Sequence, residues 1–166
     1  MHRRVLLLGI VLTAFACGGS DATTSEPTDN APQGTATNGM FTADLNGATW
    51  NAQGTVAVNR SSSFIGIGAA GLASAGTTYS LVLTFGNASA PGTFSLTYLN
   101  QANSSLIVGT PTLGWGTAFS GGTGTATITK LTSNRISGTF TADVVPSTGR
   151  TTGTLQVRNG RFDITF

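Results

Sequence analysis

The fold is decided by the stretch Phe41-Thr42-Ala43-Asp44-Leu45-Asn46-Gly47-Ala48-Thr49-Trp50. Asn-Gly between alternating apolar residues is the strongest short-range hairpin signal, because a type I′ turn needs positive φ at both central residues. A one-residue shift would mix the apolar and polar faces, so the turn and the pattern specify the same register. The expected apolar pairs are Leu45–Ala48, Ala43–Trp50 and Phe41–Ala52, and the expected polar pairs are Asp44–Thr49 and Thr42–Asn51.

Asn159-Gly160 is the second Asn-Gly dipeptide between strand-like runs, and it predicts a second hairpin. In that register Val157 faces Phe162 and Leu155 faces Ile164. Arg158 would then lie opposite Arg161, a mildly unfavourable like-charge pair whose cost the nearby Asp163 would reduce.

The rest of the chain beyond Met40 consists of short strand-like runs separated by Gly, Asn, Ser and Pro, with no apolar residues at helical spacing over three turns. This pattern predicts an all-β fold of about 8–11 short strands. The first expectation is an antiparallel β-sandwich, and the alternative is a small up-and-down β-barrel. The Gly/Ala-rich stretch 65–75 is expected to form a loop or a thin edge strand. The expected strands are 41–45, 49–58, 63–69, 78–85, 93–99, 104–108, 113–119, 123–131, 135–144, 152–158 and 161–166.

Several of these runs alternate strictly between apolar and polar residues. In the run 136–144, Ile136, Phe140 and Val144 share one face with small residues, whereas Ser, Thr and Asp143 occupy the other. Period-two alternation indicates sheets with one buried and one wet face. The wet faces carry mainly Thr and Ser, because β-branched Thr suits a pleated surface and needs no charge.

The N-terminus has the pattern of an export signal. Arg3 and Arg4 precede an apolar run of about twelve residues, which is shorter than the about twenty that span a bilayer. The run ends Leu12-Thr13-Ala14-Phe15-Ala16-Cys17, which resembles the lipobox of bacterial lipoproteins despite Ala14 and the bulky Phe15. An ordinary cleaved signal with an incidental cysteine is the alternative.

Cys17 is the one cysteine of the chain and cannot form an internal disulfide, so lipidation gives it a role. We expect its acyl chains, palmitate among them, to make the lipid bilayer a partner. Gly18 rather than Asp follows the cysteine, which by the same resemblance favours the outer over the inner membrane.

Three segments are therefore expected: a lipoprotein signal peptide at 1–16, the lipidated cysteine with a disordered tether at 17–39, and a single all-β domain at 40–166. The tether is rich in Thr, Ser, Pro and Asp and has no large apolar residue, so it cannot order itself by burial. Twenty such residues have a typical reach of about 25 Å, which would hold the domain just off the membrane.

The composition argues against common enzyme classes. His2 is the one histidine, and it lies in the expected signal peptide. Without histidine or a free thiol, the remaining chain lacks His-based acid–base catalysis, most nucleophile–base pairs and His/Cys zinc sites. We therefore expect no enzyme activity, no cofactor and no bound metal. Six basic and six acidic residues remain after Arg3 and Arg4 are removed, so no nucleic-acid partner is expected either.

The domain also resembles a family of uncharacterised β-rich bacterial lipoproteins known only as a domain of unknown function. The resemblance covers about residues 41–163 and implies a lipid-anchored β-domain on the bacterial envelope, with no activity, ligand or catalytic residue attached. The residues that carry it are Phe41–Gly47 with Trp50, Pro91-Gly92-Thr93-Phe94, Ile128-Thr129-Lys130-Leu131, Ile136-Ser137-Gly138-Thr139-Phe140 and Val157-Arg158-Asn159-Gly160-Arg161-Phe162-Asp163.

Few residues are candidates for a site. Trp115 lies between two glycines that leave its ring less covered, so it is a possible ligand-stacking platform, although core packing is the stronger interpretation. Arg150, Arg158 and Arg161 could form a small anion-binding patch, with a scattered solvated face as the alternative. The domain's carboxylates, Asp44, Asp143 and Asp163, are expected on outward faces, and nothing in the sequence pairs them for hydrolysis or calcium binding.

The sequence thus predicts a non-catalytic, lipid-anchored cell-envelope protein that acts as a binding or structural module. One alternative is a small-ligand or glycan binding protein that uses an exposed Trp115. A lesser alternative is an Asp- or metal-dependent hydrolase. The sequence leaves the protein or glycan partner open.

Overall fold

A computed structural model describes residues 34–36, 39–97, 104–147 and 149–166 of the chain. The expected signal peptide, Cys17 and most of the expected tether lie outside the described residues. None of the described residues forms a helix with the length and hydropathy needed to cross a bilayer. The strands in the described ranges are β1 (Gly34–Ala36), β2 (Gly39–Leu45), β3 (Ala48–Ala52), β4 (Val56–Arg60), β5 (Phe64–Ala73), β6 (Thr78–Gly86), β7 (Gly92–Ser95), β8 (Ser105–Gly109), β9 (Gly114–Gly116), β10 (Thr123–Leu131), β11 (Arg135–Pro146) and β12 (Leu155–Thr165).

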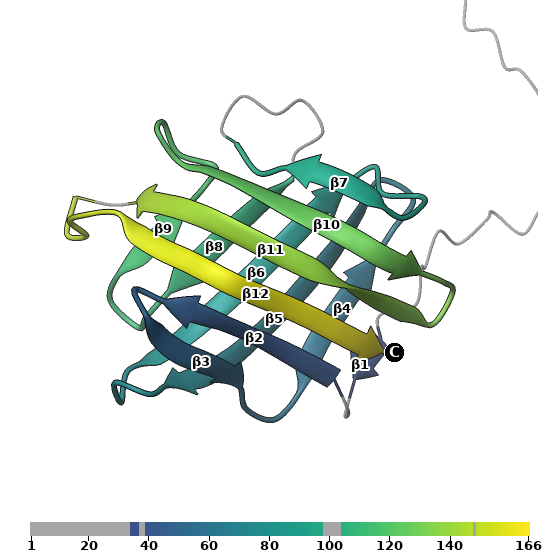
Figure 1. Cartoon of the computed structure of the whole chain (residues 1–166), viewed down its shortest axis with the longest axis horizontal. Helices are drawn as coiled ribbons and strands as arrows, with labels where there is room; N and C mark the ends of the chain where they lie inside the picture. The colour runs from purple at the N-terminus through teal and green to yellow at the C-terminus, as the bar shows by residue number, and fades with distance from the viewer. Residues whose placement is uncertain (1–33, 37–38, 98–103, 148) are drawn as a thin grey trace, which may run out of the picture.

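Eight of these strands form a closed antiparallel barrel in the order β2-β3-β5-β6-β8-β9-β11-β12, with β12 pairing back to β2. The all-β expectation is confirmed in its barrel alternative, because the β5–β6 and β12–β2 ladders close the ring and a sandwich would leave two separate sheets. Each ring strand pairs with the next ring strand along the chain, which is the up-and-down pattern. The other described strands add to the ring at two places: β4 pairs with β5 and β1 with β4, and β10 pairs with β11 and β7 with β10 (Figure 1).

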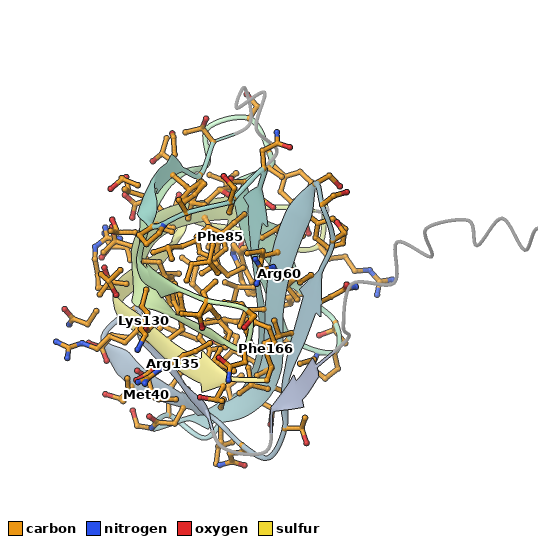
Figure 2. The ribbon with its side chains drawn as sticks, turned by 90° about the vertical axis from the view of Figure 1, so that its right-hand side faces the viewer. Met40, Arg60, Phe85, Lys130, Arg135 and Phe166 are labelled. Atoms are coloured by element: carbon orange, nitrogen blue, oxygen red, sulfur yellow. The ribbon has the colours of Figure 1, made fainter. Side chains whose placement is uncertain are left out.

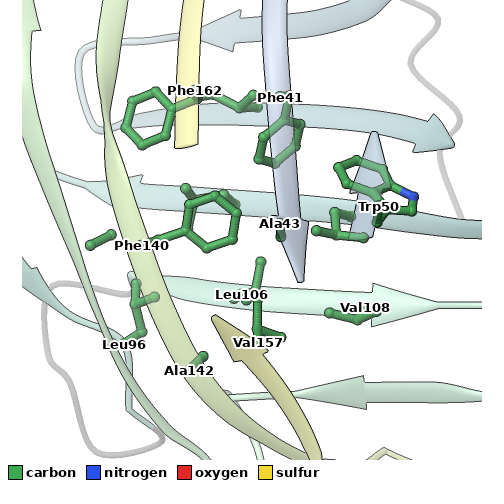
Figure 3. Packing of buried hydrophobic residues seen from close by; sticks show 14 of the residues in the cluster. Phe41, Ala43, Trp50, Leu96, Leu106, Val108, Phe140, Ala142, Val157 and Phe162 are labelled. Atoms are coloured by element: carbon green, nitrogen blue, oxygen red, sulfur yellow. The ribbon is translucent and has the colours of Figure 1, made fainter. Parts of the chain in front are cut away.

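The barrel is flattened into two layers. Figure 1 shows β2, β12, β11, β10 and β7 in the near layer and β4, β5, β6 and β8 behind them. Side chains fill the space between the layers, as the position of Phe85 in Figure 2 illustrates. Aromatic rings link the layers at the centre, where the ring centroids of Phe85 in β6 and Phe162 in β12 lie 5.7 Å apart. Phe41 packs edge-on against Trp50 of the neighbouring strand β3, at 5.4 Å between ring centroids. The interior is thus a packed core (Figure 3).

The Asn46-Gly47 hairpin is confirmed. Asn46 and Gly47 have φ values of 49° and 84°, as a type I′ turn requires. β2 pairs with β3 at four of the five predicted positions: Thr42–Asn51, Ala43–Trp50, Asp44–Thr49 and Leu45–Ala48.

The second predicted hairpin is wrong: Asn159-Gly160 is a β-bulge inside the single continuous strand β12. Two residues, Arg158 and Asn159, lie opposite the one residue Thr141 of β11, so the strand gains a residue without reversing. Asn159 has a φ of 52°, but Gly160 is not left-handed, and a type I′ turn needs both. Arg158 and Arg161 are therefore not a cross-strand pair.

The bulge also explains why the sequence pattern was misleading. In a regular strand Val157 and Phe162 would face opposite sides, because they are five residues apart. The extra residue changes the alternation, so that Leu155, Val157, Phe162 and Ile164 all point into the core. A hairpin and a bulge thus produce the same apolar pattern.

Three other expectations need correction. The Gly/Ala-rich stretch 65–75 lies mostly in β5, an inner strand that pairs with β6 on one side and with β4 and β3 on the other. Its glycines permit this close pairing, since a Cβ at Gly71 would lie 2.0 Å from the carbonyl oxygen of Asn51. The expected strand 49–58 is interrupted near Gly54, which has a φ of 78°. Gly34–Ala36, within the expected tether, forms β1.

Candidate binding groove

A polar groove lies on the outer surface of the near layer, where β10, β11 and β12 run side by side. Its volume is about 350 Å³. Gly124 and Ala142 line the floor through their backbone, because both residues face the interior of the barrel. The polar side chains that line it are those of Thr97, Thr123, Thr125, Thr141, Asp143 and Arg158.

The β10–β11 register builds one wall of the groove as two cross-strand pairs. Thr123 lies opposite Asp143, and Thr125 lies opposite Thr141. Side chains that are two residues apart in a strand point to the same face, so all four point outward together. The hydroxyl groups of the three threonines make no hydrogen bond within the described residues, and Thr97 adds another such hydroxyl from the segment after β7. The groove therefore presents hydroxyls that are free to donate and to accept.

Arg158 crosses from β12 to hold the carboxylate of Asp143. Its Nη2 donates to Oδ1 of Asp143 at 2.6 Å, and its Nη1 donates to the carbonyl oxygens of Ala142 at 2.7 Å and Val157 at 3.0 Å. Arg158 points outward because it follows the inward-facing Val157, and the ladder of β12 with β11 places it near Asp143. The second carboxylate oxygen of Asp143 has no partner among the described residues.

A second ion pair lies on the same layer, formed by β11 and β12 outside the groove. Arg135 donates from Nε at 2.8 Å and from Nη2 at 2.7 Å to the two oxygens of Asp163. These hydrogen bonds lower the pKa of Asp163 from its usual value of 3.8 and raise the pKa of Arg135. The two pairs have similar exposure, with side chains 38–45% accessible, so one serves as a control for the other.

The three carboxylates of the domain all lie on outward faces, as expected, and each has a different partner. Asp44 accepts hydrogen bonds from Thr49 and Asn159, the latter at 2.7 Å. Asp143 and Asp163 accept from the two arginines described above. Within the described ranges, no three His, Cys, Asp or Glu side chains come close enough to hold a metal ion.

The predicted arginine patch is only partly assembled. Arg158 lies in the groove with a carboxylate partner, so an anion would have to compete with Asp143. Arg161 lies exposed on the same strand between Thr42 and Thr139 of the neighbouring strands. Arg150 lies exposed in the connection between β11 and β12. An anion site at these three residues remains a prediction.

Trp115 lies in β9 and is covered, with 8% of its surface exposed. Its indole Nε1 donates to the carbonyl oxygen of Gly153 at 3.1 Å. The flanking glycines permit close packing instead of exposing the ring: a Cβ at Gly116 would lie 2.8 Å from the ring of Phe119, and one at Gly114 would lie 2.5 Å from Oγ of Ser147. Ligand stacking on Trp115 remains a prediction, and the burial leaves little of the ring for it.

The opposite outer face, on β5, β6 and β8, differs sharply from the groove layer. Its outward residues are apolar, small or hydroxyl-bearing, and none of them is ionisable. Val82 and Ile107 lie directly opposite one another at its centre and are 41% and 43% exposed. The polar groups that could recognise a ligand by directed hydrogen bonds are therefore concentrated on the groove layer.

Sequence reasoning identified Arg158 and placed Asp143 outward, but it did not find the groove. The Thr alternation of β10 was a usable signal for an outward polar face, but the turn to β11 could not give the pairs in the groove, because a bulge near Thr129 shifts the register by one residue. No pattern in the sequence around Arg158 or Thr97 indicates that these residues lie beside β10 and β11.

No protein-family model matches the chain, and neither the curated proteins nor the solved structures contain a match. The resemblance to uncharacterised lipoproteins therefore remains a prediction.

Proposed function

We propose that this protein is a non-catalytic binding module of the bacterial envelope, held at a membrane surface, with the outer membrane favoured, through acylated Cys17. The proposal for the anchor rests on the lipobox-like sequence Leu12–Cys17 and on the single cysteine. The proposal for binding rests on the structure of the barrel.

The observation that supports binding at the outer surface is the filled interior. Small barrels that carry ligands inside keep a cavity at the mouth. Here Trp50, Phe41, Phe85, Phe140 and Phe162 are fully buried and pack across the centre of the barrel. A partner therefore meets the outside of the barrel, where the groove layer offers directed polar groups.

The test is retention of the purified full chain, in detergent, on separated envelope components: lipid vesicles, peptidoglycan, surface polysaccharide and membrane proteins. We expect saturable retention on one component that excess soluble component displaces. Equal, non-saturable retention on all of them would contradict a binding function.

A further inference from the structure

We propose that the groove of Thr97, Thr123, Thr125, Thr141, Asp143 and Arg158 is a binding site for an uncharged, polyhydroxylated ligand, the chemical class of neutral glycans. This inference rests on the proposed binding function and names its site and its ligand class. The ligand class follows from the charge, the hydrogen-bonding character and the size of the groove.

The charge of the groove selects a neutral ligand. Asp143 and Arg158 are its two ionisable residues, and they form an ion pair at 2.6 Å. The pair cancels in net charge, so it gives neither an anion nor a cation a strong advantage. Its polar atoms remain directional, because two backbone carbonyls hold the guanidinium in place. Such preorganised groups lose little freedom when a ligand binds.

The hydrogen-bonding groups match sugar hydroxyls. Each threonine hydroxyl can donate one hydrogen bond and accept others, as a sugar hydroxyl can. Asp143 adds a free carboxylate oxygen, which accepts stronger hydrogen bonds than a neutral group does. Directly opposed residues of an antiparallel pair have Cβ atoms about 4.5–5.5 Å apart, so Thr125 and Thr141 can reach two hydroxyls of one sugar ring.

The size of the groove agrees with this class. Its volume of about 350 Å³ lies at the lower end of the range for small-molecule sites. Part of an oligosaccharide can occupy it while the rest extends over the surface. Gly124 and Ala142 face the interior, so the floor of the groove presents backbone groups to a ligand.

The experiment is calorimetric titration of the full chain in detergent with neutral hexasaccharides of glucose and of N-acetylglucosamine, and with an acidic uronic-acid hexasaccharide. The test variants are the double substitution Thr125→Val/Thr141→Val, which removes two exposed hydroxyls without changing shape or charge, and Asp143→Asn. Matched controls are Thr139→Val, an exposed threonine of β11 outside the groove, and Asp163→Asn, which breaks the other ion pair.

We expect a neutral hexasaccharide to bind the wild type, and each test variant to bind it about tenfold more weakly, as the loss of about two neutral hydrogen bonds or one charged one predicts. The affinity of each control variant should stay within about twofold of that of the wild type, because neither substitution removes a contact to the ligand. Added NaCl should leave the affinity unchanged, because no net charge is involved. Thermal melting checks that every variant is folded. If Asp143→Asn does not fold, the double valine variant still tests the groove, because valine favours β-strands as threonine does.

Three outcomes would overturn the inference. Preference for the acidic hexasaccharide with a steep salt dependence would show an anion site. Equal loss in test and control variants would show that the groove is not the site. Retention on an envelope component without binding to any saccharide would remove the glycan proposal and leave the proposed binding function intact, whereas no binding of either kind removes both.

Discussion

Gly160 of β12 lies directly opposite Phe140 of β11, and the ring of Phe140 occupies the space that a side chain at position 160 would need. A Cβ built on Gly160 would lie 2.6 Å from three carbons of that ring, Cγ among them. Phe140 is buried against Phe41 and Phe162 and cannot move aside freely. Glycine is thus required at 160 for space, and the left-handed φ belongs to its neighbour Asn159.

Gly160→Ala should therefore lower the free energy of unfolding by about 1–3 kcal/mol, as overpacking of a dense core does. Urea denaturation measures it. Gly149→Ala is the control, because nothing lies within 4 Å of a Cβ there, and it should leave the midpoint unchanged. A Gly160→Ala protein as stable as the wild type would contradict the assigned contact with Phe140.

Gly47 presents the opposite case, in which the backbone and not the space requires glycine. Its φ is 84°, and a Cβ there would meet nothing within 4 Å. Gly47→Val should cost about 1–3 kcal/mol of unfolding free energy, because a β-branched residue resists a left-handed conformation. Gly47→Asn should cost less, since Asn tolerates that region. Equal stabilities of the Val and Asn variants would argue against the type I′ turn.

The Arg135–Asp163 pair predicts a specific pH dependence. The pKa of Asp163 in the folded protein lies below its usual value of 3.8. The pair therefore stabilises the folded state above about pH 4, and this contribution is lost as the pH falls through the folded-state pKa. The effect should be modest, since both side chains are well exposed.

Asp163→Asn should accordingly reduce stability slightly at neutral pH and flatten the acid side of the stability curve. Melting temperatures measured from neutral to acidic pH test this. Parallel curves for the variant and the wild type would mean that the pair does not contribute.

Trp115→Phe tests whether the indole of Trp115 stabilises the fold by packing in the core. The substitution removes the hydrogen bond to the carbonyl oxygen of Gly153 and part of a covered ring. We expect the free energy of unfolding to fall by about 1–2 kcal/mol, which denaturant titration resolves. An unchanged stability, together with weaker ligand binding, would instead favour the stacking interpretation of Trp115.

Cys17→Ser tests the anchor. The variant should lose all labelling by a palmitate analogue in cells and should remain unprocessed or soluble, because the thioether to the lipid cannot form. Labelling is read on gels, and membrane association is read by fractionation. Labelling equal to that of the wild type would remove the lipid-anchor hypothesis.

The sequence by itself determined the local features of this protein. The Asn46-Gly47 turn and its register could be predicted because turn chemistry and period-two alternation act between neighbouring residues. The all-β class and the outward position of Asp143 follow from the same alternation. Arg158 could be predicted as a charged surface residue, but its ion pair with Asp143 could not be predicted.

The tertiary structure decided what depends on distant segments. Asn159-Gly160 became a bulge because β2 and β11 pair with β12 on both sides and keep the strand continuous through the dipeptide. The closure of the barrel depends on the β12–β2 ladder, which joins the two ends of the domain. The groove exists because β10 and β12 pair with β11 on opposite sides, which brings Arg158 to Asp143 beside the threonines of β10. Alternation along one strand sets the face on which a side chain lies, but only the pairing of strands sets which side chains share that face.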